Sequence, residues 1–181
     1  MRKQITFHNR IKKTYAVYLS IADIQICLST NSNVVYLVLK KYYRKYIHAL
    51  SKTTRTYTIE LDESAAIPEV TRRASHHFYI RFPNIAGDFY SFNDYFRRVF
   101  ADILVQNNGV LLHASAIVYK KYTYIFTGPE GAGKSTISRL FPKRSVRGDD
   151  VAVIRMMQGV PYLFGSPFYQ KTRRAYPNTK T

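Results

Sequence analysis

Apolar and polar residues alternate in several short segments of the first half of the chain. Segments 15–19 and 24–28 are β-prone, and the short polar break between them has the length of a hairpin turn. Segments 57–61 and 78–82 also alternate as half-buried strands do. The polar stretch 62–75, which contains a proline, is predicted to be a loop.

Two other stretches carry apolar residues at helical spacing. In the first, the positions from Leu39 to Leu50 predict a helix. In the second, a continuous apolar stripe runs from Phe92 to Leu104 and predicts a longer helix. Ser91 or Asn93 can cap its start, and 107–109 offers residues suited to a left-handed end. We assign this longer helix to packing and expect no functional site on it.

After Leu111 short strands predominate, and one of them runs directly into a glycine-rich stretch. Lys120–Lys121 is predicted to form a turn between strands 113–119 and 122–126. Residues 135–141 are predicted to form a short helix that ends before a proline. The predicted strands are 113–119, 122–126, 144–150 and 151–156.

These elements predict an α/β or α+β protein with a boundary near residue 110. Residues 1–109 are expected to form a small β-rich α+β region with two helices, which is a candidate for substrate recognition. Residues 110–181 are expected to form a mixed β-sheet core with a short helix after the glycine-rich stretch. The second region carries the motifs with identifiable chemistry.

Composition limits the class of protein. A chain of 181 residues, of which 46% are hydrophobic, can form one domain with a sizeable core. Its longest apolar runs are much shorter than the roughly 20 residues that span a bilayer, so no membrane span is expected. No apolar segment follows the basic N-terminus, so no signal peptide is indicated. A single cysteine, Cys27, excludes an internal disulfide, and we expect a cytoplasmic protein.

The charge balance is strongly basic. The chain has 28 Lys and Arg against 11 Asp and Glu, a net charge of +17, which favours acidic or polyanionic partners. A nucleic-acid surface is one interpretation, while a nucleotide site and genome bias towards lysine and tyrosine are others. The tyrosines of the basic segment 40–46 fall at helical spacing, which indicates core packing beneath a solvated basic face. Nucleic acid is therefore not the expected partner.

The glycine-rich stretch matches the phosphate-binding pattern G-x-x-x-x-G-K-S in full. It comprises Gly128, Pro129, Glu130, Gly131, Ala132, Gly133, Lys134 and Ser135, with Thr136 directly after it. Its glycines allow successive backbone N–H groups to point at an anion. Lys134 can reach the β- and γ-phosphates of a nucleotide, and the Ser135 hydroxyl can bind magnesium. The motif predicts a P-loop that binds ATP with magnesium.

Asp149 and Asp150 form the acidic pair nearest to this motif, 15 and 16 residues after Lys134. Since they end a predicted strand, both can approach the phosphates there. One carboxylate can then hold magnesium while the other accepts a proton from an attacking hydroxyl. The alternative is a solvated acidic turn.

Three motifs in this order resemble the catalytic core of HPr kinase/phosphorylase, a family with the phosphoenolpyruvate carboxykinase-like P-loop fold. They are Leu112-His113-Ala114-Ser115, Phe126 to Thr136, and Gly148-Asp149-Asp150. The chain is similar above all to the HPr-kinase-like proteins found with ribosomally made peptide pathways, in which an element like Gly165-Ser166-Pro167-Phe168 follows. The resemblance covers roughly residues 110 to 178.

The resemblance implies a kinase that transfers the γ-phosphoryl group of ATP to a serine hydroxyl of a peptide or small protein. It implies that Asp149 is the catalytic carboxylate and that His113 orients or tunes it. It also implies that Asp150 and Ser135 hold magnesium, while Lys134 contributes to catalysis through its charge.

The chain also departs from the family pattern. Glu130 stands where the family usually carries serine, beside the expected phosphate site. Family members usually continue beyond the position of Thr181, so we expect an incomplete core, and the phosphorolysis motif has no counterpart. Two alternatives therefore stand beside the kinase, namely a non-catalytic nucleotide-binding module and a basic, nucleic-acid-associated NTP-binding protein. An oligomer is compatible with the sequence.

Overall fold

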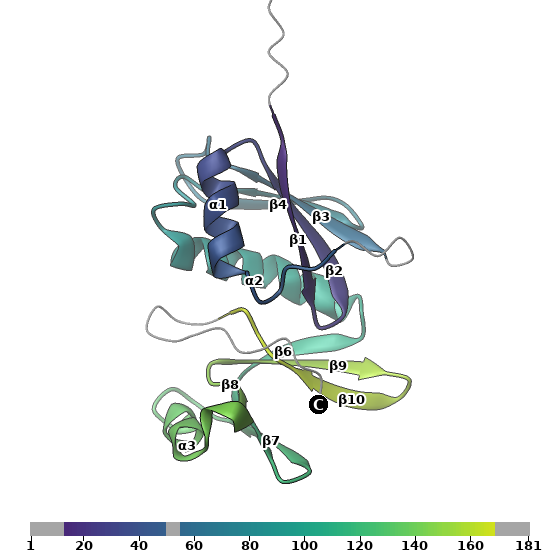
Figure 1. Cartoon of the computed structure of the whole chain (residues 1–181), viewed down its shortest axis with the longest axis vertical. Helices are drawn as coiled ribbons and strands as arrows, with labels where there is room; N and C mark the ends of the chain where they lie inside the picture. The colour runs from purple at the N-terminus through teal and green to yellow at the C-terminus, as the bar shows by residue number, and fades with distance from the viewer. Residues whose placement is uncertain (1–12, 50–54, 169–181) are drawn as a thin grey trace, which may run out of the picture.

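The computed structural model describes residues 13–49 and 55–168 (Figure 1). Within these residues the chain forms two β-sheets and three α-helices, which confirms a mixed α and β protein. None of the helices in the described ranges has the length and apolar content needed to cross a bilayer. Leu50, at the end of the first predicted helix, lies outside the described residues.

The first sheet contains five strands in the order β1-β2-β3-β5-β4. Its central pairs, β2–β3 and β3–β5, are parallel, and the outer pairs are antiparallel. The predicted β1–β2 hairpin is confirmed, with Ala22 and Asp23 in the left-handed region (φ 52° and 58°), as a two-residue turn requires. The strands are β1 (Tyr15–Ile21), β2 (Ile24–Thr30), β3 (Thr56–Asp62), β4 (Glu69–Ala74) and β5 (His77–Arg81).

Two helices cover one face of this sheet. Alternate residues of β2 and β3 are buried, and they share a single hydrophobic core with α1 (Asn33–Tyr42) and α2 (Phe89–Val105). Side chains of intermediate exposure occupy the opposite face of β2 and β3. The alternation that predicted the strands therefore also determined which face receives the helices.

The bounds predicted for the first helix were wrong. The helix begins at Asn33 because the Ser32 hydroxyl accepts a hydrogen bond from the backbone N–H of Val35 (3.3 Å). It ends at Tyr42, and the chain then returns to β1, where the N–H of Ser20 bonds to the carbonyl of Tyr46 (2.8 Å). Tyr46 is nevertheless fully buried, so the prediction that tyrosines of this segment pack in the core is confirmed.

Two further predictions in this half need correction. The stretch expected to be a loop contains β4, an edge strand exposed along its whole length, so its polar composition hid the strand. The longer helix, α2, begins at Phe89, earlier than expected, because the Asp88 carboxylate caps it by accepting from the N–H of Ser91 (3.3 Å). Its left-handed end is confirmed at Asn108 (φ 57°).

The second sheet is antiparallel throughout, in the order β10-β9-β6-β7, with β8 also paired to β6. The predicted turn at Lys120 is confirmed (φ 54°), as is the short helix α3 (Lys134–Leu140). Within the predicted strand 144–150 the segment of β8 (Val146–Gly148) is confirmed, while its start lies in a 3-10 turn (Lys143–Ser145) and its end in a bend; β10 was not predicted. The strands are β6 (Gly109–Tyr119), β7 (Tyr122–Thr127), β8 (Val146–Gly148), β9 (Val151–Met157) and β10 (Val160–Phe164).

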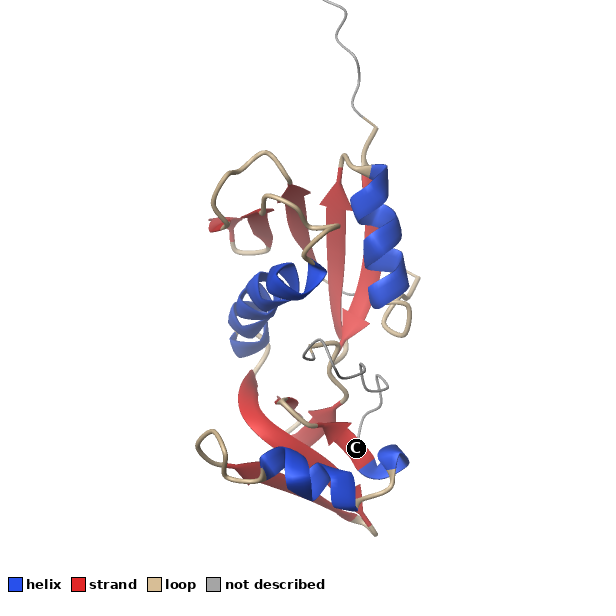
Figure 2. Cartoon of the chain, turned by 90° about the vertical axis from the view of Figure 1, so that its left-hand side faces the viewer, coloured by secondary structure: helices blue, strands red, loops and turns tan. Residues whose placement is uncertain are grey.

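One hydrophobic core joins the two sheets. The Phe168 ring, which follows the second sheet, contacts Phe96 and Phe100 of α2 at centroid distances of 5.5 and 5.3 Å. The Arg155 guanidinium of β9 also donates to the carbonyl of Ala22 in the first hairpin (2.9 Å). The helix α2 lies between the sheets (Figure 2). The boundary near residue 110 therefore divides the two sheets, but residues from both sides of it share this hydrophobic core.

Phe168→Ala should lower the free energy of unfolding by about 3–5 kcal/mol, because it removes a buried ring from between α2 and the second sheet. Tyr122→Ala is the matched control, since Tyr122 is 57% exposed. Urea unfolding followed by circular dichroism measures both variants. Equal stabilities for the two variants would contradict a shared core.

Candidate functional site

The glycine loop (residues 128–133) connects β7 to α3. Gly131 and Gly133 have φ values of 79° and 85°, which side-chain-bearing residues adopt only at a cost in strain. A Cβ on either residue would meet no other atom within 4 Å, so backbone conformation and not lack of space requires glycine here. The loop thus has an open surface, on which Glu130 is exposed.

Lys134 folds back onto this loop. Its Nζ donates to the carbonyl oxygens of Gly128 (2.7 Å) and Pro129 (2.8 Å), and the residue is only 9% exposed. A buried ammonium group needs such partners, because leaving water without them is costly. The carbonyls are neutral dipoles, so an anion that entered the loop would attract the ammonium more strongly.

Ser115 on β6 is a site residue to which the sequence analysis gave no role. Its side chain is fully buried, and its hydroxyl donates to the backbone carbonyl of Lys134 (2.6 Å). This bond attaches the start of α3 to the central strand of the second sheet. A serine between two alanines in a mostly apolar strand was the available sequence signal.

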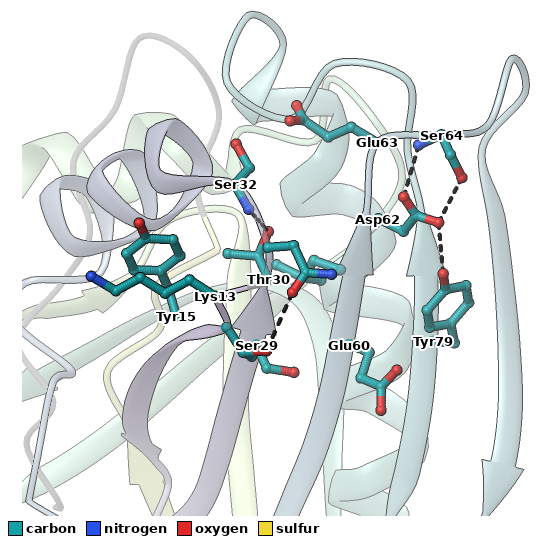
Figure 3. A pocket seen from close by; sticks show the side chains of 13 residues that line it. Lys13, Tyr15, Ser29, Thr30, Ser32, Glu60, Asp62, Glu63, Ser64 and Tyr79 are labelled. Atoms are coloured by element: carbon teal, nitrogen blue, oxygen red, sulfur yellow. Dashed lines mark hydrogen bonds between the residues drawn. The ribbon is translucent and has the colours of Figure 1, made fainter. Parts of the chain in front are cut away.

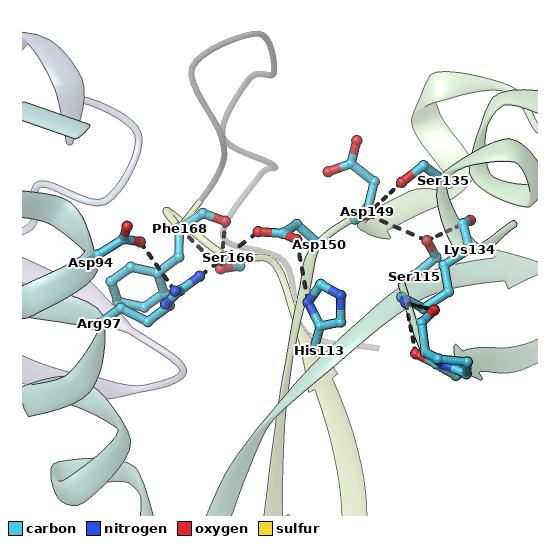
Figure 4. Close-up of polar contacts among 12 residues, drawn as sticks. Asp94, Arg97, His113, Ser115, Lys134, Ser135, Asp149, Asp150, Ser166 and Phe168 are labelled. Atoms are coloured by element: carbon cyan, nitrogen blue, oxygen red, sulfur yellow. Dashed lines mark hydrogen bonds and ion pairs between the residues drawn. The ribbon is translucent and has the colours of Figure 1, made fainter. Parts of the chain in front are cut away.

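The acidic pair occupies the bend between β8 and β9. Gly148 precedes it, and a Cβ there would lie 2.3 Å from the carbonyl oxygen of Val151, so the tight bend requires glycine. The carbonyl of Asp150 accepts from the N–H of Ala114, and the Ser135 hydroxyl donates to the carbonyl of Asp149 (3.5 Å). The three sequence motifs therefore meet in one place (Figure 4).

The Asp150 carboxylate contacts two basic side chains. Its Oδ1 lies 3.4 Å from His113 Nδ1, and its Oδ2 lies 3.8 Å from Arg97 Nη1. The Asp150 side chain is only 8% exposed, whereas that of His113 is 61% exposed. The family resemblance predicted that His113 orients Asp149. The ion pair is with Asp150 instead, because His113 lies opposite Val151 in the β6–β9 ladder.

The two carboxylates point in different directions. In Figure 4 the Asp150 carboxylate points towards His113 and Arg97, while the half-buried Asp149 side chain lies between Asp150 and Ser135. The Ser135 hydroxyl and the Asp150 carboxylate, which were predicted to share magnesium, are not side by side in this arrangement.

Arg97 comes from α2, the helix to which the sequence analysis assigned no site. That expectation left out Arg97, which contacts Asp150 as well as Asp94, whose Oδ1 lies 3.1 Å from Arg97 Nη2. Nothing in the helical pattern distinguishes Arg97 from Arg98, since both stand outside the apolar stripe of α2. Only the packing of α2 beside the bend brings Arg97, and not Arg98, into contact with Asp150.

The donor set around the loop fits a metal ion that is bound together with phosphates. Magnesium usually takes only one or two protein oxygens and fills its other positions with water and phosphate. Ser135, Asp149 and Asp150 offer oxygens of this kind. Among the described residues no three His, Cys, Asp or Glu side chains gather as a metal site would require, so an all-protein cage is not offered there.

A sizeable cavity lies elsewhere, over the first sheet (Figure 3). It measures about 780 Å³ and opens where β2 and β3 end. Its carboxylates already have internal partners. Asp62 accepts from the Ser64 hydroxyl (2.6 Å) and the Tyr79 hydroxyl (2.7 Å), and the bonds from Ser64 foremost hold the pKa of Asp62 below its ordinary value. Glu63 accepts from the N–H of Ile85.

Comparison of the chain with protein-family models and with curated proteins finds no match.

Ser115→Ala should reduce the free energy of unfolding by about 1 kcal/mol, because it removes a buried hydrogen bond that holds the start of α3. Urea unfolding measures this loss. Ser91→Ala, at an exposed serine, is the control and should change stability by less than about 0.5 kcal/mol. An effect of Ser115→Ala as small as that of the control would contradict the structural role.

Proposed function

We propose that this protein is an ATP-dependent kinase that transfers the γ-phosphoryl group to a serine hydroxyl of a peptide or small protein. One observation carries the proposal: a glycine loop that holds a buried lysine lies next to a bend with two adjacent carboxylates. The loop supplies cationic and N–H groups for phosphates, and the bend supplies acids for metal and proton. Phosphoryl transfer needs both sets of groups.

In this proposal the glycine loop binds the phosphates of ATP. Lys134 exchanges its two carbonyl partners for oxygens of the β- and γ-phosphates, which are charged and therefore stronger acceptors. The backbone N–H groups of the loop contribute further donors. Ser115 keeps the start of α3 in place during this exchange, because its bond is to the Lys134 backbone and not to the side chain.

Asp149 is proposed as the general base. The oxygen of the acceptor serine forms a bond to the γ-phosphorus, and the bond between that phosphorus and the β–γ bridging oxygen breaks, so ADP leaves. The serine proton passes to the Asp149 carboxylate. Asp149 suits this role because its side chain is half-buried and lies on the Ser135 side of the bend.

Asp150 and Ser135 are proposed to hold magnesium, which when bound neutralises charge on the phosphates. Asp150 is proposed as a ligand because it is the buried carboxylate of the bend, and the Ser135 hydroxyl already donates to the neighbouring Asp149 carbonyl. Residues 1–109 are proposed to recognise the peptide or protein that carries the serine.

Lys134→Ala should weaken ATP binding by about tenfold or more, or about 1.4 kcal/mol or more, because it removes the charged contact to the phosphates. Isothermal titration calorimetry measures the dissociation constant. Lys121→Ala changes the same residue type at the exposed hairpin turn and serves as the control. Parent-like affinity in Lys134→Ala would rule out phosphate binding by this loop.

Asp149→Asn and Asp150→Asn should separate the two acidic roles. Asp149→Asn should abolish transfer to an acceptor peptide but keep magnesium-dependent ATP affinity, because it removes only the proton acceptor. Asp150→Asn should lose the part of the ATP affinity that depends on magnesium. Intact-mass analysis of candidate peptides with magnesium-ATP reports transfer, and calorimetry with and without magnesium reports binding.

The outcomes distinguish the kinase from its alternatives. Magnesium-dependent ATP binding without transfer to any candidate peptide would indicate a non-catalytic nucleotide-binding module. The reverse assignment, in which Asp149→Asn loses the metal dependence, would exchange the roles of the two carboxylates.

A further inference from the structure

We infer that Arg97 is a positioning residue of the phosphoryl-transfer site, through which the N-terminal region holds Asp150 in place. The inference rests on the proposed function, because it assigns Asp150 to the magnesium site. It extends that function by making catalysis depend on α2, an element outside the motif-bearing half of the chain.

The contacts of Arg97 form a bridge between two carboxylates. Nη1 lies 3.8 Å from Asp150 Oδ2, and Nη2 lies 3.1 Å from Asp94 Oδ1, three residues earlier on the same helix. Asp94 holds one end of the guanidinium against α2 while the other end faces the acidic bend. A planar guanidinium held at both ends has a defined orientation, which a single contact would not give.

Burial of Asp150 makes this partner necessary. Its side chain is 8% exposed, and an ionised carboxylate that leaves water without a compensating partner is strongly destabilised. His113 can compensate only when it is protonated, whereas the Arg97 guanidinium keeps its charge at every physiological pH. Arg97 is therefore the cation that compensates and orients the Asp150 carboxylate in this structure.

The hydrophobic core fixes the distance between α2 and the bend. Phe96 and Phe100, which flank Arg97 along α2, both contact the ring of Phe168, which follows the second sheet. Asp150 leads directly into β9 of that sheet, so the packing that joins the two halves also sets the position of Arg97. A change in the N-terminal region that moved α2 would reach Asp150 through this residue.

The neighbouring arginine provides a matched control. Arg98 belongs to the same helix, but its guanidinium lies 5.0 Å from the ring centroid of Tyr95. Arg97→Ala and Arg98→Ala remove the same group one position apart, so any general effect of lost charge or helix composition is shared. Only Arg97→Ala removes a contact to Asp150.

The experiment is a double-mutant cycle on the full chain. Calorimetry gives the ratio of ATP affinities with and without magnesium for the parent, Arg97→Ala, Asp150→Asn and the double variant. Arg97→Ala should reduce this ratio by about tenfold, whereas Arg98→Ala should change it by less than about twofold. In the Asp150→Asn background Arg97→Ala should have no further effect, because its influence passes through the missing carboxylate.

Arg97→Lys completes the test, since it keeps the charge without the two-ended geometry. Arg97→Lys should recover part of the magnesium dependence of ATP affinity that Arg97→Ala loses. Circular dichroism checks that each variant is folded. If Arg97→Ala does not fold, Arg97→Lys takes its place in the cycle. Additive effects in the cycle, or equal effects of Arg97→Ala and Arg98→Ala, would overturn the inference.

These outcomes are distinct from failure of the proposed function. A parent that binds magnesium-ATP but transfers nothing would refute the kinase, while the cycle would still decide the role of Arg97. A parent whose ATP binding does not depend on magnesium would overturn both.

Discussion

The contact between α2 and Phe168 determines how the two halves of this protein fit together. The apolar stripe of α2 covers the first sheet, and on the same helix Phe96 and Phe100 receive the ring that follows the second sheet. Because interiors are close-packed, this contact allows little variation in the distance between the halves. The meeting of Arg97 with the acidic bend follows from it.

Two buried ionisable side chains give the site its character. Lys134 is balanced by loop carbonyls, and Asp150 lies beside Arg97 and His113. Each arrangement compensates a buried charge within the protein, and in the function proposed above Lys134 would exchange its carbonyl partners for phosphate oxygens.

The sequence was most informative where structure depends on near neighbours along the chain. Strand alternation located β1, β2, β3 and β5, and the run from β7 through the glycine loop into α3 was recognised as a unit. It was less informative at element ends. Ser32 and Asp88 start their helices earlier than the apolar stripes suggest, because capping depends on one hydrogen bond and not on periodicity. The exposed edge strand β4 lacked the alternation that burial imposes.

By itself, therefore, the sequence determined the mixed α and β composition, the hairpin at Ala22 and the position of the glycine loop, since each depends on residues only a few positions apart. It also identified the acidic pair. Tertiary structure alone decided that His113 contacts Asp150, that Ser115 holds the start of α3, and that Arg97 enters the site. These contacts join residues 19 to 53 positions apart, and the packing of separate elements, which no local periodicity records, brings them together.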